Sequence, residues 1–182
     1  MKIRTKKCSV EISFYFIAVA ALMMIVFPQS KGLFCFVFCI MHEAGHLAAM
    51  LLFGKRPVKI CFGYFGMKIV TGGRMVSTFG EIMIALAGPL VNIILFAFFI
   101  CMKANEAAYL NIGLAVFNLM PVAMLDGGRI IMAVAKPTFP IKKIGLTVSI
   151  IILVLGICVA VYAKNNFTLL FVGIYLVTGN FA

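Results

Sequence analysis

The stretch "MHEAGHLAAM", residues 41–50, decides how the rest of the chain is interpreted. It holds both histidines of the protein, His42 and His46, and one of its five acidic residues, Glu43. The flanking segments, "LFCFVFCI" before it and "LLF" after it, are apolar enough for a lipid bilayer. An ionisable group in such a setting costs about 2.5 kcal/mol or more, so it points to a function.

The composition predicts an integral membrane protein. Hydrophobic residues make up 64% of the 182 residues and charged residues 12%, and the mean hydropathy is +1.17. Soluble domains contain roughly half apolar and a quarter charged residues. We therefore expect an all-α membrane protein with about six transmembrane helices, forming one domain over residues 1–182. The apolar stretches are Ile12–Phe27, Leu33–Phe53, Ile82–Met102, Tyr109–Ala135, Ile144–Ala163 and Phe167–Asn180.

The net charge of +11 is explained by membrane topology. If the six stretches cross alternately, thirteen of the sixteen Lys and Arg residues fall on one side and only Lys31, Lys103 and Lys164 on the other. This bias predicts a multi-pass protein of the cell membrane with both termini in the cytoplasm, and a nucleic-acid partner is not expected. The first stretch is interpreted as a retained anchor rather than a cleaved signal. The six cysteines form no CxxC pair and predict no disulfide framework.

The pattern HExxH predicts half of a metal site. On a helix, His42 and His46 lie on one face one turn apart, and both can bind a single Zn²⁺ while Glu43 stands beside it as a general base. The alternative is that these side chains only hydrogen-bond neighbouring helices. A catalytic zinc site needs a third protein ligand, which here must be acidic or a thiol because no histidine remains.

Asp126 is the third ligand that we predict. Unlike Glu11, Glu81 and Glu106, it lies within an apolar stretch rather than at its edge. His46 precedes Lys55 by nine residues and Asp126 precedes Lys136 by ten, so both should lie about 14 Å from the same membrane face. Cys39 remains a rival ligand, because it follows the same helix face as His42.

Three further features could act on a substrate. Residues 57–73, "PVKICFGYFGMKIVTGG", predict two short strands after the histidine helix, and an exposed edge there could add a substrate as another strand. A cytosolic hairpin without a substrate role is the alternative. Asn92 could bind a substrate backbone or support an oxyanion, or could simply join helices. Asn118 and Pro121 are expected to shape a break that presents Asp126.

Three ordered motifs resemble those of the site-2 proteases, a family of intramembrane zinc metalloproteases. They are "HEAGH" (42–46), "ALAGPLVN" (85–92) and "NLMPVAMLDGGR" (118–129), within a motif-bearing core of residues 33–135. The order and spacing look most similar to the stage IV sporulation protein FB branch. The resemblance implies zinc bound by His42, His46 and Asp126, with Glu43 as the catalytic base. PDZ and CBS domains found in parts of the family are not expected in this chain.

The resulting hypothesis is an intramembrane zinc endopeptidase that hydrolyses membrane-associated regulatory proteins near the cytoplasmic face. By resemblance, its substrates would be membrane-tethered or transmembrane proteins such as a sigma-factor precursor or an anti-sigma factor, and a regulatory membrane partner is conceivable. One alternative is a membrane transporter or sensor that only binds metal. Another is a catalytically silent protein that binds membrane segments, although binding alone would not need Glu43.

Overall fold

The computed structural model describes residues 2–4, 9–14, 17–18, 21, 30–63, 66–72, 76–162 and 167–181. The chain divides into two compact units, Met1–Val116 and Phe117–Ala182. Within the described residues, three helical spans are long and apolar enough to cross a membrane, and they are Gly32–Leu52, Thr78–Cys101 and Ile141–Tyr162. The mostly helical fold of a membrane protein is therefore confirmed, whereas the single domain over residues 1–182 stays a prediction.

The first unit contains a small sheet of four strands in the order β1-β2-β3-β4. Strands β3 (Arg56–Gly63) and β4 (Gly66–Gly72) form the predicted antiparallel hairpin, with Gly63 opposite Gly66. The sequence did not predict β1 (Lys2–Arg4) and β2 (Ser9–Ile12), of which β2 pairs in parallel with β3. Most of the expected first crossing, Ile12–Phe27, lies outside the described residues, and Ile12 itself ends β2.

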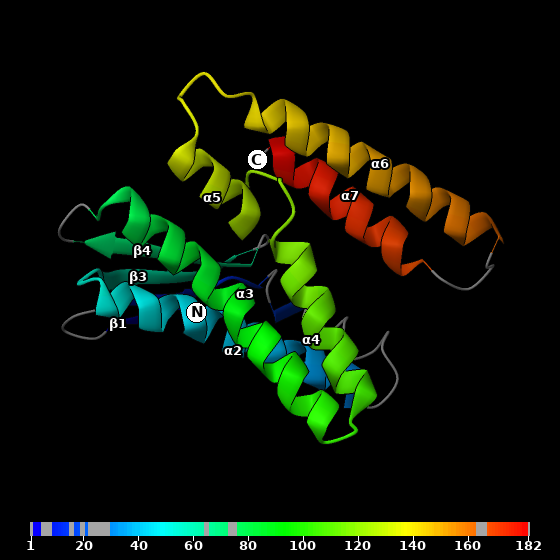
Figure 1. Cartoon of the computed structure of the whole chain (residues 1–182), viewed down its shortest axis with the longest axis horizontal. Coiled ribbons are helices and arrows are strands. Elements are labelled where there is room, and N and C mark those ends of the chain that lie inside the picture. Colours follow the sequence, from blue (N-terminus) through cyan, green and yellow to red (C-terminus); the bar gives the residue numbers. More distant parts are fainter. Residues whose placement is uncertain are drawn as a thin grey trace. The chain divides into compact units, whose positions relative to one another are not determined.

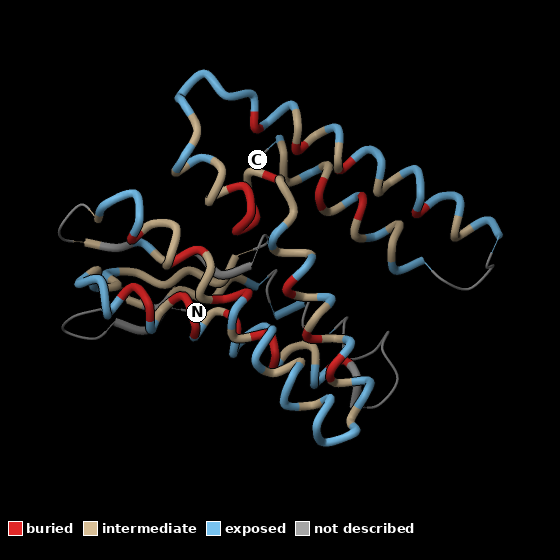
Figure 2. Tube along the Cα trace, in the orientation of Figure 1, coloured by how far each residue is buried: buried red, intermediate tan, exposed pale blue. Residues whose placement is uncertain are grey.

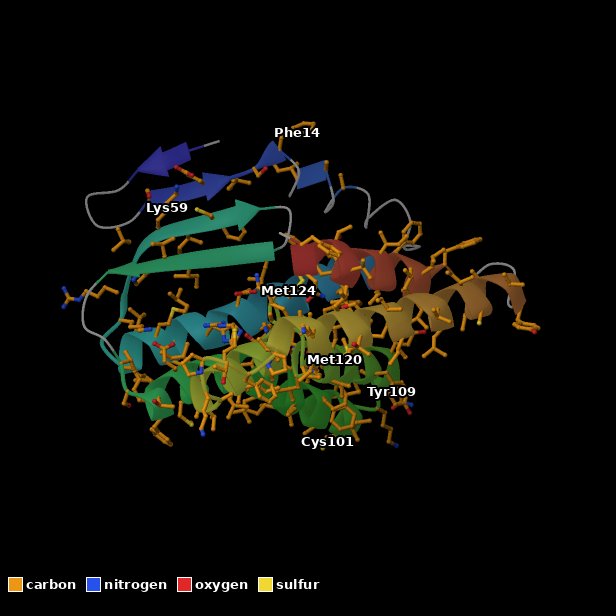
Figure 3. The ribbon with its side chains drawn as sticks, turned by 90° about the horizontal axis from the view of Figure 1, so that it is seen from above. Phe14, Lys59, Cys101, Tyr109, Met120 and Met124 are labelled. Atoms are coloured by element: carbon orange, nitrogen blue, oxygen red, sulfur yellow. The ribbon has the colours of Figure 1, made fainter. Side chains whose placement is uncertain are left out.

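Helices α2 (Ser30–Leu52) and α3 (Thr78–Cys101) are the two long apolar helices of this unit. The two helices lie side by side in Figure 1, and Figure 3 shows the sheet along the α2 side of the pair. Their contact is a small core of Ala49, Met50 and Ile84, on which Ile69 of β4 packs. The sheet thus packs against the C-terminal end of α2, the end that follows the HExxH motif.

Local signals explain where these helices begin and end. Gly54, with φ of +74°, takes the left-handed conformation that closes α2 and turns the chain into β3. Ser77 caps α3 by accepting a hydrogen bond from the Gly80 backbone N–H at 3.2 Å. The ion pair between Lys55 and Glu81 joins the end of α2 to the start of α3. These contacts place the histidine helix and α3 in a fixed register.

The apolar stretch Tyr109–Ala135 does not form one continuous helix. Helix α4 (Asn105–Asn118) ends before Pro121, and α5 (Asp126–Val134) begins after a non-helical segment, residues 119–125. The predicted break is therefore confirmed. Its sharpness depends on Gly127, because a Cβ there would lie only 2.1 Å from the Leu119 carbonyl oxygen. Glycine lets the loop fold directly against the first turn of α5.

The second unit is dominated by a helical hairpin of α6 (Ile141–Tyr162) and α7 (Thr168–Phe181), which lie side by side in Figure 1. Val122, Leu125 and Leu176 form its buried core. Figure 2 shows the long outward face of α6 as exposed, and the side chains on it are apolar, including Ile151, Val154 and Leu155. An apolar face of this length is the surface that a helix presents to lipid tails.

Candidate metal centre

His42 and His46 project from α2 toward α3 and are both buried, with 5% and 3% of their surface exposed. Their Nε2 atoms lie 3.1 Å apart, and their rings are nearly perpendicular, at 84°. The i, i+4 spacing of the motif therefore produces the predicted pair of adjacent imidazole nitrogens.

The partners of the two Nδ1 atoms fix which nitrogen carries the proton. His46 Nδ1 lies 2.7 Å from the backbone carbonyl oxygen of Ile84, which can only accept a hydrogen bond. His42 Nδ1 lies 2.6 Å from Oδ1 of Asn92, also an acceptor. Both rings therefore donate from Nδ1, and in the neutral imidazoles both Nε2 atoms present a lone pair. Hydrogen bonds from Nδ1 to an oxygen acceptor orient histidines whose Nε2 binds a metal.

Glycines bring the backbone of α3 against this pair. A Cβ at Gly45 would lie 2.7 Å from the Ala87 carbonyl oxygen, so the Gly of "HEAGH" allows the close approach of the two helices. A Cβ at Gly88 would lie 2.4 Å from His46 Nε2 and 2.6 Å from His42 Nε2. The missing side chain of Gly88 thus leaves a cradle beside both nitrogens. Pro89 follows it and lacks the N–H that a regular helix would need there.

The two imidazoles fit a divalent metal ion. Two nitrogens bound at about 2.0–2.1 Å to one tetrahedral Zn²⁺ lie roughly 3.3 Å apart, close to the 3.1 Å observed. Two lone pairs at this distance can both be bound by one cation. The cradle at Gly88 provides space next to both donors. Neutral imidazole is also a preferred ligand for zinc and its neighbours in the periodic table.

Glu43 follows His42 on α2 and is half-buried. It is the residue between the two histidines of the motif that the sequence predicts to transfer protons. Cys39, the rival ligand, lies one turn earlier and is exposed, in contrast to the two buried histidines. Ligation by Cys39 stays the alternative prediction.

The remaining predicted residues lie on other elements. Asp126 is the first residue of α5, and its Oδ1 accepts a hydrogen bond from Arg129 Nη1 at 3.2 Å. A carboxylate in the first turn is favoured by the helix dipole. Asp126 belongs to the unit Phe117–Ala182 and the histidines to Met1–Val116, so its role as third ligand stays a prediction. Asn118 is half-buried at the end of α4, and its role also stays a prediction.

Asn92 contacts His42 directly. It is completely buried on α3, and the contacts seen are with His42 and with Asn111 of α4. Direct binding of a substrate or oxyanion by Asn92 therefore stays a prediction, whereas its bond to His42 is observed. The sequence interpretation missed Asn111. Its signal was an amide within an apolar helix, which usually marks a hydrogen bond across helices.

Comparisons with known proteins agree with this architecture. A sequence model of the family described as Peptidase family M50 matches residues 103–159. The zinc metalloprotease MJ0392 of Methanocaldococcus jannaschii is 28% identical over 166 residues, covering 79% of this chain and 46% of the relative. The solved structure of the site-2 protease from Methanocaldococcus jannaschii superimposes with a TM-score of 0.73 at 22% identity, covering 99% of this chain and 93% of that one.

The fold and the imidazole pair together define a membrane protein in which helices α2 and α3 enclose two adjacent imidazole nitrogens. In sequence the chain is similar to peptidase family M50 over residues 103–159, and it shares the fold of the solved site-2 protease. The chain spans about half the length of the curated relative that it matches. Its assignment to the stage IV sporulation protein FB branch stays a prediction.

Proposed function

We propose that the protein is an intramembrane zinc endopeptidase that hydrolyses peptide bonds of membrane-associated regulatory proteins near the cytoplasmic face. The observation that carries this proposal is the pair of buried imidazoles, each donating from Nδ1, with Glu43 beside them on α2. Metal binding alone would not require a carboxylate at that position. The zinc metalloprotease named among the relatives supports the same conclusion.

Three side chains would hold the zinc ion in this proposal: His42 and His46 from α2, and Asp126 from the start of α5. The support for Asp126 is its place in the "LDGG" motif and its position directly after the break at Pro121. Bound zinc would act as a Lewis acid that makes water more acidic and polarises the scissile carbonyl.

Glu43 performs the proton transfers. Its carboxylate takes a proton from the attacking water, whose oxygen forms a bond to the carbonyl carbon. When the peptide C–N bond breaks, the same carboxyl group gives the proton to the leaving nitrogen, so the group returns to its ionised state. General acid–base catalysis of this kind contributes about 10²–10⁴-fold to a rate.

The substrate is proposed to bind as an extended strand beside β4. A transmembrane helix hides its carbonyl groups in hydrogen bonds, and unpaired backbone groups in lipid cost several kcal/mol each. Strand β4 is an edge of the sheet among the described residues, and it follows directly from the hairpin after α2. Pairing with that edge would replace the hydrogen bonds that the substrate loses on unwinding. Tethered sigma-factor precursors and anti-sigma factors are the substrate types that we propose.

The proposed topology has six crossings and both termini in the cytoplasm. Its support is the distribution of thirteen against three basic residues along the chain. Reporter fusions at the two termini that both give a cytoplasmic signal would agree with it, and a periplasmic or extracellular signal at either end would contradict it.

The central experiment compares wild type with Glu43→Gln, co-expressed with candidate tethered substrates in the same membranes. We expect the variant to keep its zinc and to lose cleavage by about 100-fold or more, because only proton transfer is removed. The matched control is Glu106→Gln, the same change at an exposed carboxylate, which should cleave normally. Equal processing by wild type and Glu43→Gln would exclude the protease mechanism. Zinc binding without any processing would favour the transporter or sensor.

A further inference from the structure

A continuous line of buried hydrogen bonds runs from α4 to the metal-ligand pair. The Asn111 amide nitrogen Nδ2 donates to the Ala107 carbonyl oxygen at 2.9 Å, and Asn92 Nδ2 donates to Asn111 Oδ1 at 3.0 Å. The line ends at His42, whose Nδ1 lies 2.6 Å from Asn92 Oδ1. Asn92 and Asn111 are both completely buried. All four residues belong to the unit Met1–Val116.

The direction of this line is fixed at its far end. The Ala107 carbonyl can only accept, so Asn111 must present its NH₂ group there and its oxygen toward Asn92. Asn92 must then present its own NH₂ group to Asn111, which leaves its oxygen facing His42. An oxygen at that place accepts a proton from Nδ1 and so keeps the Nε2 lone pair on the metal side. A backbone carbonyl of α4 thus determines the tautomer of a histidine on α2.

We infer that Asn111 is a positioning residue for His42, acting through Asn92 to hold the imidazole in the tautomer that binds metal. The inference rests on the proposed zinc site but not on its proteolytic activity. Without the Asn111 oxygen, the Asn92 amide can rotate by half a turn and offer its NH₂ group to His42. His42 Nδ1 would then have to accept, the proton would move to Nε2, and the ligand atom would be blocked.

A role limited to joining helices makes a different prediction. Hydrogen bonds between membrane helices contribute to stability whichever way they point. A positioning role depends on the polarity of the Asn111 group that faces Asn92, because only an acceptor fixes the orientation of that amide. At position 111, a substitution that removes the acceptor should therefore change the tautomer of His42, whereas one that keeps the acceptor but weakens the contact should not. This difference separates the positioning role from the joining role.

The tautomer can be read directly, because the chain contains only two histidines. The full-length protein is labelled with ¹⁵N-histidine, stripped of metal, and studied in lipid nanodiscs above neutral pH, where protonated and unprotonated ring nitrogens give distinct shifts. Wild type should show Nδ1–H for both histidines. A wild-type spectrum with His42 mainly protonated at Nε2 would overturn the inference without any variant being made.

The decisive variant is Asn111→Leu, which removes the acceptor at similar volume. We expect a substantial Nε2–H population at His42 and a zinc dissociation constant raised by about 10–100-fold, the usual effect of losing a group that hydrogen-bonds a metal ligand. Asn111→Asp keeps an acceptor toward Asn92, so it should retain the Nδ1–H tautomer even if the protein is less stable. The matched control is Asn105→Leu, the same change at an exposed position of α4, which should leave both readouts unchanged.

Zinc affinity is measured by competition with a chelating dye, so neither readout requires a substrate. The inference would be wrong if Asn111→Leu kept the wild-type tautomer and bound zinc with a dissociation constant within about twofold of wild type. Asn111 would then only join helices. Asn111→Asp would contradict the inference if it shifted the proton to Nε2. If the protein binds zinc as expected but cleaves nothing, the proposed function fails and the role of Asn111 stands.

Discussion

Glycine allows close approach of the backbones in both helix pairs, α2–α3 and α6–α7, but the consequence differs between the two pairs. In α6–α7, a Cβ at Gly156 would lie 2.6 Å from the Leu170 backbone, and a Cβ at Gly173 would lie 2.5 Å from the Leu153 Cα. These glycines only let two apolar helices approach closely. In α2–α3, Gly45 has that role, but Gly88 faces the two Nε2 atoms of the histidines instead.

Buried polar groups show the same contrast. Between α6 and α7, Ser149 Oγ donates to the Gly145 carbonyl oxygen and accepts from Asn180 Nδ2 at 3.0 Å, so these bonds stay within the α6–α7 pair. Between α2, α3 and α4, the bonds of Asn92 and Asn111 lead to His42, which we propose to bind metal. The polar groups of α6–α7 therefore contribute to packing, whereas those of α2–α3 contact the imidazole pair. Each can be disturbed separately.

Gly88→Ala should give the largest effect. The added methyl group would lie 2.4–2.6 Å from the ligand nitrogens, so the imidazoles must move out of register. We expect zinc affinity to fall by about 100-fold or more, beyond the 10–100-fold typical of outer-shell changes, and cleavage to fall with it. Metal content and dye competition measure the first effect. Gly113→Ala is the control, because a Cβ there meets nothing within 4 Å, and zinc binding as tight as in wild type is expected.

Gly156→Ala should have an intermediate effect that spares the metal. Its methyl group would meet the backbone of α7, which cannot rotate away, so overpacking should cost about 1–3 kcal/mol of unfolding free energy. Denaturant unfolding in detergent measures this loss against Gly113→Ala, which corrects for the higher helix propensity of alanine. Zinc affinity should remain unchanged. A parallel loss of zinc binding would show that the two helix pairs are not independent.

The smallest effect is expected at the sheet, where Lys59 Nζ lies 2.7 Å from a Glu11 carboxylate oxygen (Lys59 is labelled in Figure 3). The hydrogen bond to Glu11 raises the pKa of Lys59 above its ordinary value. A raised pKa in the folded state stabilises the protein below the unfolded pKa of about 10.4, and that contribution is lost as pH rises through the folded pKa. Because the pair is solvent-screened, Glu11→Gln should lower the unfolding midpoint only slightly at neutral pH.

The midpoints of wild type and Glu11→Gln should therefore converge in strongly alkaline solution. A difference that grew with alkaline pH would contradict the assigned pair. Metal affinity should be unaffected at every pH, because the sheet pair is distinct from the imidazole pair.

Much of the helical part of the fold was predictable because membrane helices are recognisable in a sequence as long apolar runs. The sequence indicated the helix that carries His42 and His46, the break at Pro121, and the hairpin around Gly63 and Gly66. It did not indicate β1 and β2. Strands of three and four residues are too short for a recognisable period, and β2 exists because it pairs with β3 from far along the chain.

The sequence by itself determined that this is a membrane protein and that its two histidines share one helix face, because apolar length and the i, i+4 spacing are local properties. Only the tertiary structure decided which nitrogen of each ring faces the metal side. That choice depends on the Ile84 carbonyl and on Asn92 and Asn111, which neighbouring helices bring to α2. A tautomer is set by the partner across the interface, and no spacing along a single helix can specify that partner.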